Sequence, residues 1–437
     1  MTNVGAPFDP AHPFDPPAPH EGTRITTLYA TACSLPPDRA IHGTPAVDVF
    51  AFSRLASFYR TSQDQLPHVL LRHDIDPDTL RFRRWNGHLT AAQVWLFTLP
   101  SGQIIVGLTL DLTDTPVQSI PLLEDLYYVE AELDGHPFQA WCHTLATTIN
   151  DCTLKGNPEF LPERHQLVFS AVAHPSELPS RDQLQRIIYR ADLSTRSEDS
   201  SIRAPGELNR RDNSTAALGP FVSVIAGHQG YLENSVLLSA VQIVGSAARL
   251  RDIRERAYQC VRTFRTHLDD TLPERERRLV FEDIADELGE LELELSFSVE
   301  ATADLGLLIP SLRVESYHDA LYESMNLARR TRTTSHMLDR LRNAIDSELT
   351  AVTSIEDRID DDRRVRTVAA VTFVSTVGGT LAILFGFFGI NASEVDPSIS
   401  MFDFEYLPIY LLIAGVVVVA LCLYLVLGWR RRLNALK

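Results

Sequence analysis

The sequence predicts a mixed domain of helices and strands, of the α+β or α/β class, followed by long helices and two apolar C-terminal helices. Short runs rich in β-branched and aromatic residues alternate with turn residues from Thr26 to about His174. After Gly230 the apolar residues recur mostly at spacings of three and four, which is the helical period. Two stretches near the C-terminus carry no charged side chain. The chain has 437 residues, 45% of them hydrophobic, so the part before these stretches can form one or two domains with buried cores.

The composition limits the partners and the redox chemistry. A net charge of -17 disfavours a nucleic-acid partner, whose phosphates would be repelled. Residues 1–24 are rich in proline and lack an apolar segment behind a basic start, so we expect a disordered tail and not a signal peptide. The cysteines form no C-x-x-C pair and are odd in number, which predicts reduced core residues without a disulfide framework or structural zinc site: Cys33, Cys142, Cys152, Cys260 and Cys422.

Residues 25–228 are expected to form the cytoplasmic α/β domain. Strands are predicted at 104–110, 126–129 and 166–172, and a helical interval at Val47–Tyr59. The polar segment 175–219 has little periodicity and is expected to be a loop or linker, with a short element at Leu184–Ala191.

Residues 229–366 are expected to be a cytoplasmic helical region. Pro273 interrupts the first helical run, and Pro310 ends the acidic segment Arg277–Glu300. From about Val314 no proline intervenes until Pro397. We therefore expect one stalk helix of roughly 75 residues, about 110 Å long, whose last third enters a membrane.

The two apolar stretches are long enough to span a bilayer. Residues 367–390 give about 24 residues and about 36 Å of helix, against a hydrocarbon core of about 30 Å. Residues 407–429 form the second predicted span, 391–406 the external loop, and 430–437 a basic tail. Arginines flank the pair of spans and none lies in the loop, which predicts a multi-pass protein of the inner or plasma membrane with both termini cytoplasmic: Arg363, Arg364, Arg366, Arg430, Arg431 and Arg432.

The first span ends in Gly389-Ile390-Asn391. Alone, such a tripeptide is an ordinary helix ending. Together with the two spans, the charge asymmetry and the long stalk, it resembles the CorA family of divalent-cation channels, in which a Gly-x-Asn signature, usually Gly-Met-Asn, closes the first of two C-terminal spans. The matching sequence here is Phe385-Gly-Phe-Phe-Gly-Ile-Asn391. The resemblance covers residues 230–437 in layout, whereas the N-terminal region matches only in being large, acidic and α/β.

The resemblance implies a funnel-shaped homopentamer in membrane lipid that passes divalent cations, with Mg²⁺ as the expected ion and Co²⁺ and Ni²⁺ as related ones. Five Asn391 side chains would ring the external mouth. Their neutral oxygens suit the water shell that Mg²⁺ gives up reluctantly. We expect no cofactor and no enzyme activity, since the sequence contains no P-loop, nucleophile elbow, dinucleotide fingerprint or H-E-x-x-H.

Helical steps back from Asn391 give the pore lining that the resemblance implies: Val368, Val371, Ser375, Gly379, Ala382 and Gly386. Val368 and Val371 would then form a hydrophobic constriction. The alternative is that Gly378, Gly379 and Ala382 let membrane helices pack closely.

Two other functions stay open. The first is zinc transport of the ZntB type, because Ile390 replaces the usual methionine as in the zinc-transporting ZntB branch. However, neither the loop nor the proposed lining contains His or Cys, which zinc prefers as ligands. The second alternative is a membrane-anchored sensory or binding module that transports nothing.

Three acidic groups in the sequence are candidates for attracting or binding cations. In the loop, Glu394, Asp396, Asp403 and Glu405 would raise the local cation concentration, or only keep the hairpin solvated. Before the first span, Asp357, Asp360, Asp361 and Asp362 are candidates for a regulatory metal, or again a solvated helix face. The cluster His73-Asp74-Ile-Asp76-Pro-Asp78 is expected to be a polar turn.

Overall fold

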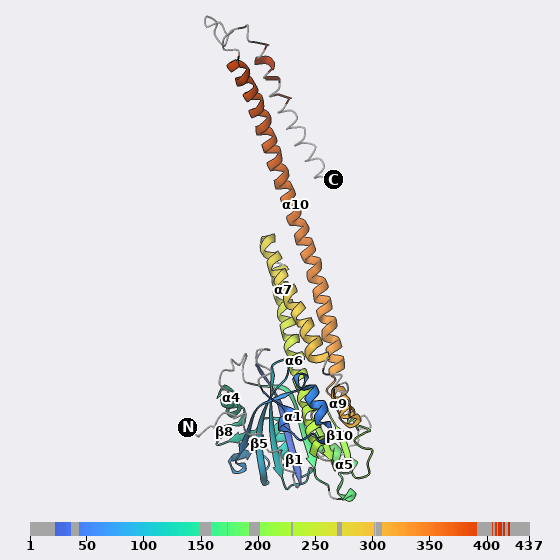
Figure 1. The fold of residues 1–437 in the computed structure, drawn as a ribbon. Helices are drawn as coiled ribbons and strands as arrows, with labels where there is room; N and C mark the ends of the chain where they lie inside the picture. Colours follow the sequence, from blue (N-terminus) through green and yellow to red (C-terminus); the bar gives the residue numbers. More distant parts are fainter. Residues whose placement is uncertain are drawn as a thin grey trace. The chain divides into compact units, whose positions relative to one another are not determined.

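Figure 1 shows the computed structural model of the chain. The structure describes residues 22–35, 43–148, 159–172, 174–191, 202–228, 230–268, 273–300, 302 and 308–390, and scattered positions between 404 and 419. The chain divides into two compact units, one of residues 1–268 with 283–344 and the other of residues 269–282 with 345–437. The predicted tail 1–24 lies almost entirely outside the described residues.

The first unit is built on an eight-stranded sheet of order β10-β11-β9-β1-β6-β5-β3-β2. All neighbouring strands are antiparallel except β9 and β11, so the mixed domain is of the α+β kind. The strands are β1 (Thr23–Ser34), β2 (Thr44–Pro45), β3 (His68–Ile75), β5 (Leu89–Thr98), β6 (Gln103–Leu112), β9 (Phe160–Ser170), β10 (Thr215–Leu218) and β11 (Val222–Ala226). A small second sheet joins β4 (Leu80–Phe82), β7 (Ala131–Leu133) and β8 (His136–Pro137).

Helices cover both faces of the large sheet, which explains why its central strands are apolar on both sides. One core contains the buried faces of α3 (Ile120–Tyr127), α4 (Phe138–Thr148) and α5 (Arg181–Tyr189). On the other face α6 (Gly230–Leu268) runs against β1, β6 and β9. On this side Gly107 leaves room for the Phe97 ring, since a Cβ at this position would lie 3.2 Å from it.

The remaining elements complete both units. Short helices α1 (Ala46–Val49) and α2 (Ala56–Thr61) precede β3, and 3-10 turns occur at Ser53–Leu55, Gln63–Gln65, Pro77–Thr79 and Pro175–Glu177. After α6 come α7 (Glu274–Leu295), a π-helical segment (Ser296–Glu300), α9 (Leu312–Ser324) and α10 (Leu327–Ile390). Three of the predicted reduced cysteines, Cys33, Cys142 and Cys260, are buried and free, whereas Cys152 and Cys422 lie outside the described residues.

The strands predicted at 104–110 and 166–172 lie in β6 and largely in β9, and are confirmed. The strand predicted at 126–129 is wrong, because its first two residues form the last turn of α3 and Tyr128 is the C-cap of that helix. The leucines of α3 follow a helical spacing, and the aromatic pair at its end only imitates a strand signal. The helical interval Val47–Tyr59 is divided into α1 and α2, with Ser53 between them at a φ of 51°.

Segment 175–219 contains more structure than its polar composition predicted. The short element expected at 184–191 is α5, which begins at Arg181 behind a capping box of Ser180 and Gln183 and buries Ile187 and Ile188. Near the end of the segment, β10 pairs with β11 as an edge strand. Strand pairing of this kind depends on distant residues, so local composition gave no sign of it.

The predicted uninterrupted helix from about Val314 is wrong at one position. Asn326 has a φ of 58°, the left-handed conformation, and separates α9 from α10. Its amide donates to the Glu323 carbonyl, and its own carbonyl accepts from Arg330 at the start of the next helix. Asparagine tolerates this conformation better than most residues, so it ends one helix and begins another without a proline.

Candidate functional site

The six residues predicted to line a pore lie on one continuous helix, α10, and all are exposed. At about 100° per residue, positions 368, 371, 375, 379, 382 and 386 fall within an arc of about 80° and extend over about 27 Å. The group comprises two valines near its start, then only serine, glycine and alanine. The predicted lining is therefore a narrow stripe of small and apolar side chains that carries no charge.

No contact within the described part of the chain requires the glycines of α10. A Cβ added at Gly378, Gly379 or Gly386 would meet nothing within 4 Å. Both interpretations of these residues, pore lining and helix packing, therefore concern groups outside this helix. They stay open as predictions.

Apolar side chains are also exposed on the other sides of α10. Val374 and Leu381 are 67% and 44% exposed, and Val365 and Phe373 are more than a third exposed. A helix that is apolar on all sides is typical of a protein interior or a lipid environment. Among the residues that the structure describes, no helix combines the length and hydropathy of a membrane span. The side chains at 380, 383–385 and 387–390 are not among those described.

The predicted mouth lies mostly beyond the described residues. Gly389 and Ile390 are in the last turn of α10, but their side chains are not described. Asn391 and the loop residues Glu394, Asp396, Asp403 and Glu405 lie outside the described residues, as does most of the second predicted span. Their roles therefore remain predictions.

The four aspartates before the predicted span lie exposed along α10. Helical geometry turns Asp362 about 140° away from Asp357, so the four carboxylates do not converge. Asp360 lies 4.0 Å from the Arg363 guanidinium. Within the described residues no three or more His, Cys, Asp or Glu side chains are arranged to hold a metal ion. A regulatory cation at this position would therefore need further ligands from outside the described chain.

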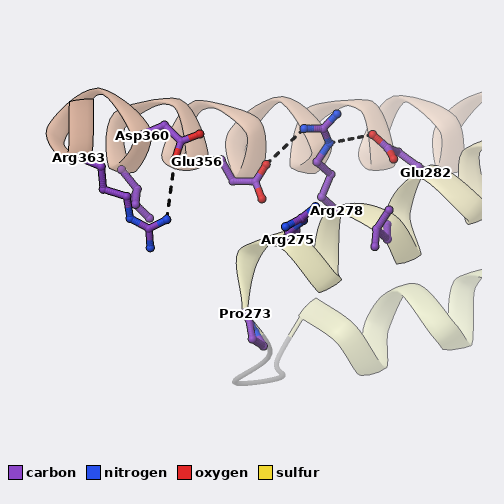
Figure 2. Close-up of a pocket in the computed structure, with 9 residues that line it drawn as sticks. Pro273, Arg275, Arg278, Glu282, Glu356, Asp360 and Arg363 are labelled. Carbon is purple, nitrogen blue, oxygen red and sulfur yellow. Dashed lines mark hydrogen bonds and ion pairs between the residues drawn. The ribbon is translucent and has the colours of Figure 1, made fainter. Parts of the chain in front are cut away.

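In the second unit a cavity of about 690 Å³ lies where the first turns of α7 face α10 (Figure 2). Arg278 donates to Glu282 over 2.8 Å and to Glu356 of α10 over 3.3 Å. These two carboxylates raise the pKa of Arg278 above its usual value. The arginine therefore links the start of α7 to α10 in the segment just before the predicted span.

The cluster at His73–Asp78 is only partly the polar turn that the sequence predicted, because its first half, His73 to Ile75, is the end of β3 and only its second half forms the turn. Asp76 accepts from the amide of Asp78 over 3.1 Å and caps a 3-10 turn. His73 lies beside the Trp141 ring, with the centroids 5.3 Å apart.

Two features of the first unit were not expected from the sequence. Buried histidines sit in fixed hydrogen bonds: His165 Nε2 lies 2.7 Å from Ser223 Oγ, and His318 Nδ1 lies 2.9 Å from Ser239 Oγ. Burial lowers the pKa of each to about 4. A second cavity, of about 620 Å³, lies beside the α9–α10 break. The sequence patterns predicted neither the buried histidines nor this cavity, because both depend on residues far apart in the chain.

Comparisons with known proteins add a structural likeness. No protein family matches the sequence, and no curated protein matches it either. Among solved structures, the chain is similar to the structure of the full-length CmaX protein, with 14% sequence identity, covering 62% of this chain and 90% of that chain. The TM-score is 0.28. A likeness of this size shows neither the family nor the function of the chain.

Proposed function

We propose that the chain is a passive, CorA-like divalent-cation transporter of the cell membrane, that it works as a funnel-shaped homopentamer, and that it imports Mg²⁺. The observation that supports this most is the uncharged stripe on α10 from Val368 to Gly386, which leads toward Asn391. Five such stripes around an axis would form a lumen without fixed charge. A fixed charge would hold a divalent ion too tightly for it to leave.

The order of residues along the stripe fits passage of a hydrated ion. Gly379, Ala382 and Gly386 leave room for the water shell that Mg²⁺ loses only reluctantly. Val368 and Val371 are the bulkiest members, and their ring would be the place where the pore closes by excluding water. The driving force needs no nucleotide hydrolysis, since about 100 mV, negative inside, favours entry of a divalent ion by about 4.6 kcal/mol.

The test is ion flux into liposomes that contain the purified chain. Asn391→Ala is expected to reduce Mg²⁺ flux at least about tenfold, because the ring of oxygens that receives the hydrated ion is removed. Ser393→Ala, two residues further along the same loop, is the matched control and should keep its flux. Equal flux in the native chain and Asn391→Ala would contradict the role of the mouth.

The same liposomes separate the alternatives. Uptake of Zn²⁺ that depends on a pH gradient, with no uptake of Mg²⁺, would favour a ZntB-like zinc transporter. An intact oligomer that passes neither ion under any voltage would favour a membrane-anchored sensory or binding module.

A further inference from the structure

The cavity of about 620 Å³ in the first unit has a volume suited to a small organic ligand. Its walls come from the end of α3, the start of β9, the loop before β11, the middle of α6 and the α9–α10 break. All of these elements belong to one compact unit. The cavity shares no lining residue with the stripe on α10 that the proposed transport uses.

Four arginines and two glutamates line this cavity, and among the described residues only Arg251 of the four arginines has an acidic partner. Arg251 is held by Glu163 through two hydrogen bonds of 2.7 Å, one to each carboxylate oxygen, so this pair is neutral. Glu255 lies 3.9 Å from Arg251. Within the described part of the chain, Arg254 and Arg330 make no side-chain hydrogen bond or ion pair. They are cations available to a ligand.

A third cation is fixed in the wall. The Arg164 guanidinium donates to the backbone carbonyls of Tyr127 and Leu161, neither of which carries a charge. Its buried Nε finds no acceptor among the described residues. The charges of three arginines are therefore balanced only by the single carboxylate of Glu255. The lining of the cavity is positive, although the net charge of the chain is -17. At about 0.15 M salt, screening over about 8 Å lets these nearest charges dominate.

The cavity also offers aromatic surface and an unused hydroxyl. Phe221 and Tyr258 are 40% and 56% exposed. Tyr127 is less available, since the Arg190 guanidinium lies 3.6 Å from its ring centroid. The buried Ser324 hydroxyl, at the end of α9, has no partner among the described groups. Exposed rings beside unpaired arginines suit a ligand with a planar ring and a negative group.

We propose that this cavity binds a nucleoside phosphate, with its phosphate groups on Arg254 and Arg330 and its base against Phe221 or Tyr258. Guanidinium groups match the geometry of phosphate oxygens better than ammonium groups do. The volume exceeds what a bare phosphate would fill. Since Ser324, Met325 and Asn326 also line the cavity, occupancy favours one geometry of the α9–α10 break.

The test is calorimetric titration of the purified full-length chain with ADP, adenosine and inorganic phosphate in a buffer containing EDTA, so that no divalent ion contributes. ADP is expected to bind saturably and more tightly than either fragment. Arg254→Ala and Arg330→Ala should each weaken ADP binding about 10- to 100-fold, the loss typical of a charge-assisted hydrogen bond. The double substitution Phe221→Leu with Tyr258→Leu should weaken ADP binding and leave phosphate binding unchanged.

Arg329→Ala is the matched control, because Arg329 is an exposed neighbour of Arg330 that does not line the cavity. An equal loss in Arg329→Ala would reduce the binding to non-specific charge attraction and overturn the proposal. So would an absence of saturable ADP binding by the folded native chain. Phe221→Asp could instead dissociate the oligomer. If it does, and neither the native oligomer nor the dissociated variant binds ADP, this face is a subunit contact and not a ligand site. Hydrogen exchange at residues 324–327 should slow with ADP and stay unchanged in Arg330→Ala.

Discussion

The buried ring of His318 should make the first unit sensitive to acid. The side chain is 1% exposed on α9. Its Nε2 lies 2.6 Å from the Thr302 carbonyl oxygen, which only accepts, so Nε2 carries the hydrogen and Nδ1 accepts from the Ser239 hydroxyl. Burial lowers the pKa of the ring to about 4, so the ring is neutral in the folded chain at pH 7.

The size of the effect follows from proton linkage. In the unfolded chain the histidine has a pKa of about 6.5, so between pH 6.5 and 4 the unfolded state binds more protons than the folded state. Folding free energy supported by the neutral ring is fully present above about pH 7 and is lost as the pH falls toward 4. Between pH 7 and pH 5 this one group should cost about 2 kcal/mol. His165, with the same direction and cause, adds a similar loss.

The assay is urea unfolding of the purified chain in detergent at pH 7 and pH 5, followed by tryptophan fluorescence. Trp85, Trp95 and Trp141 all lie in the first unit. His318→Gln keeps hydrogen-bonding capacity but cannot titrate, so its loss of stability between the two pH values should be about 2 kcal/mol smaller than in the native chain. His336→Gln, at an exposed site, is the control. If both variants show the pH dependence of the native chain, the assignment of a neutral His318 is refuted.

Two further predictions concern the helices. Asn326→Val should destabilise the chain by about 1–2 kcal/mol in urea unfolding, because a β-branched residue is strained at a φ of 58°. Asn326→Gly should be close to neutral, since glycine adopts this conformation without strain. Equal stability of the two variants would argue against the left-handed break. Gly289→Ala, within α7 where an added Cβ meets nothing within 4 Å of the described chain, should stabilise by about 0.5–1 kcal/mol in the same assay. A loss of stability there would mean that another surface packs against this position.

The strand and helix patterns of the sequence and the positions of its prolines were enough to predict the order of the main elements. The run of β-branched and other apolar residues in β6 and the spacing of three and four in α6 are local properties, so they predicted a mixed domain followed by long helices. Pro273 and Pro310 bounded helices as expected, since a missing amide hydrogen acts wherever the residue stands. The same local reasoning placed all six candidate lining residues on one face, because a continuous helix fixes their angles.

Tertiary structure decided what local patterns leave open. The Tyr127–Tyr128 region reads as a strand by composition but ends α3, since its leucines are buried against the sheet. Segment 175–219 contributes α5 and β10 because distant strands offer them a surface. Only folding brings Arg254 of α6, Phe221 before β11 and Arg330 of α10 around one cavity, and only burial keeps His165 and His318 neutral. These properties depend on neighbours far away in sequence, whereas helix and strand periods depend on neighbours a few residues away.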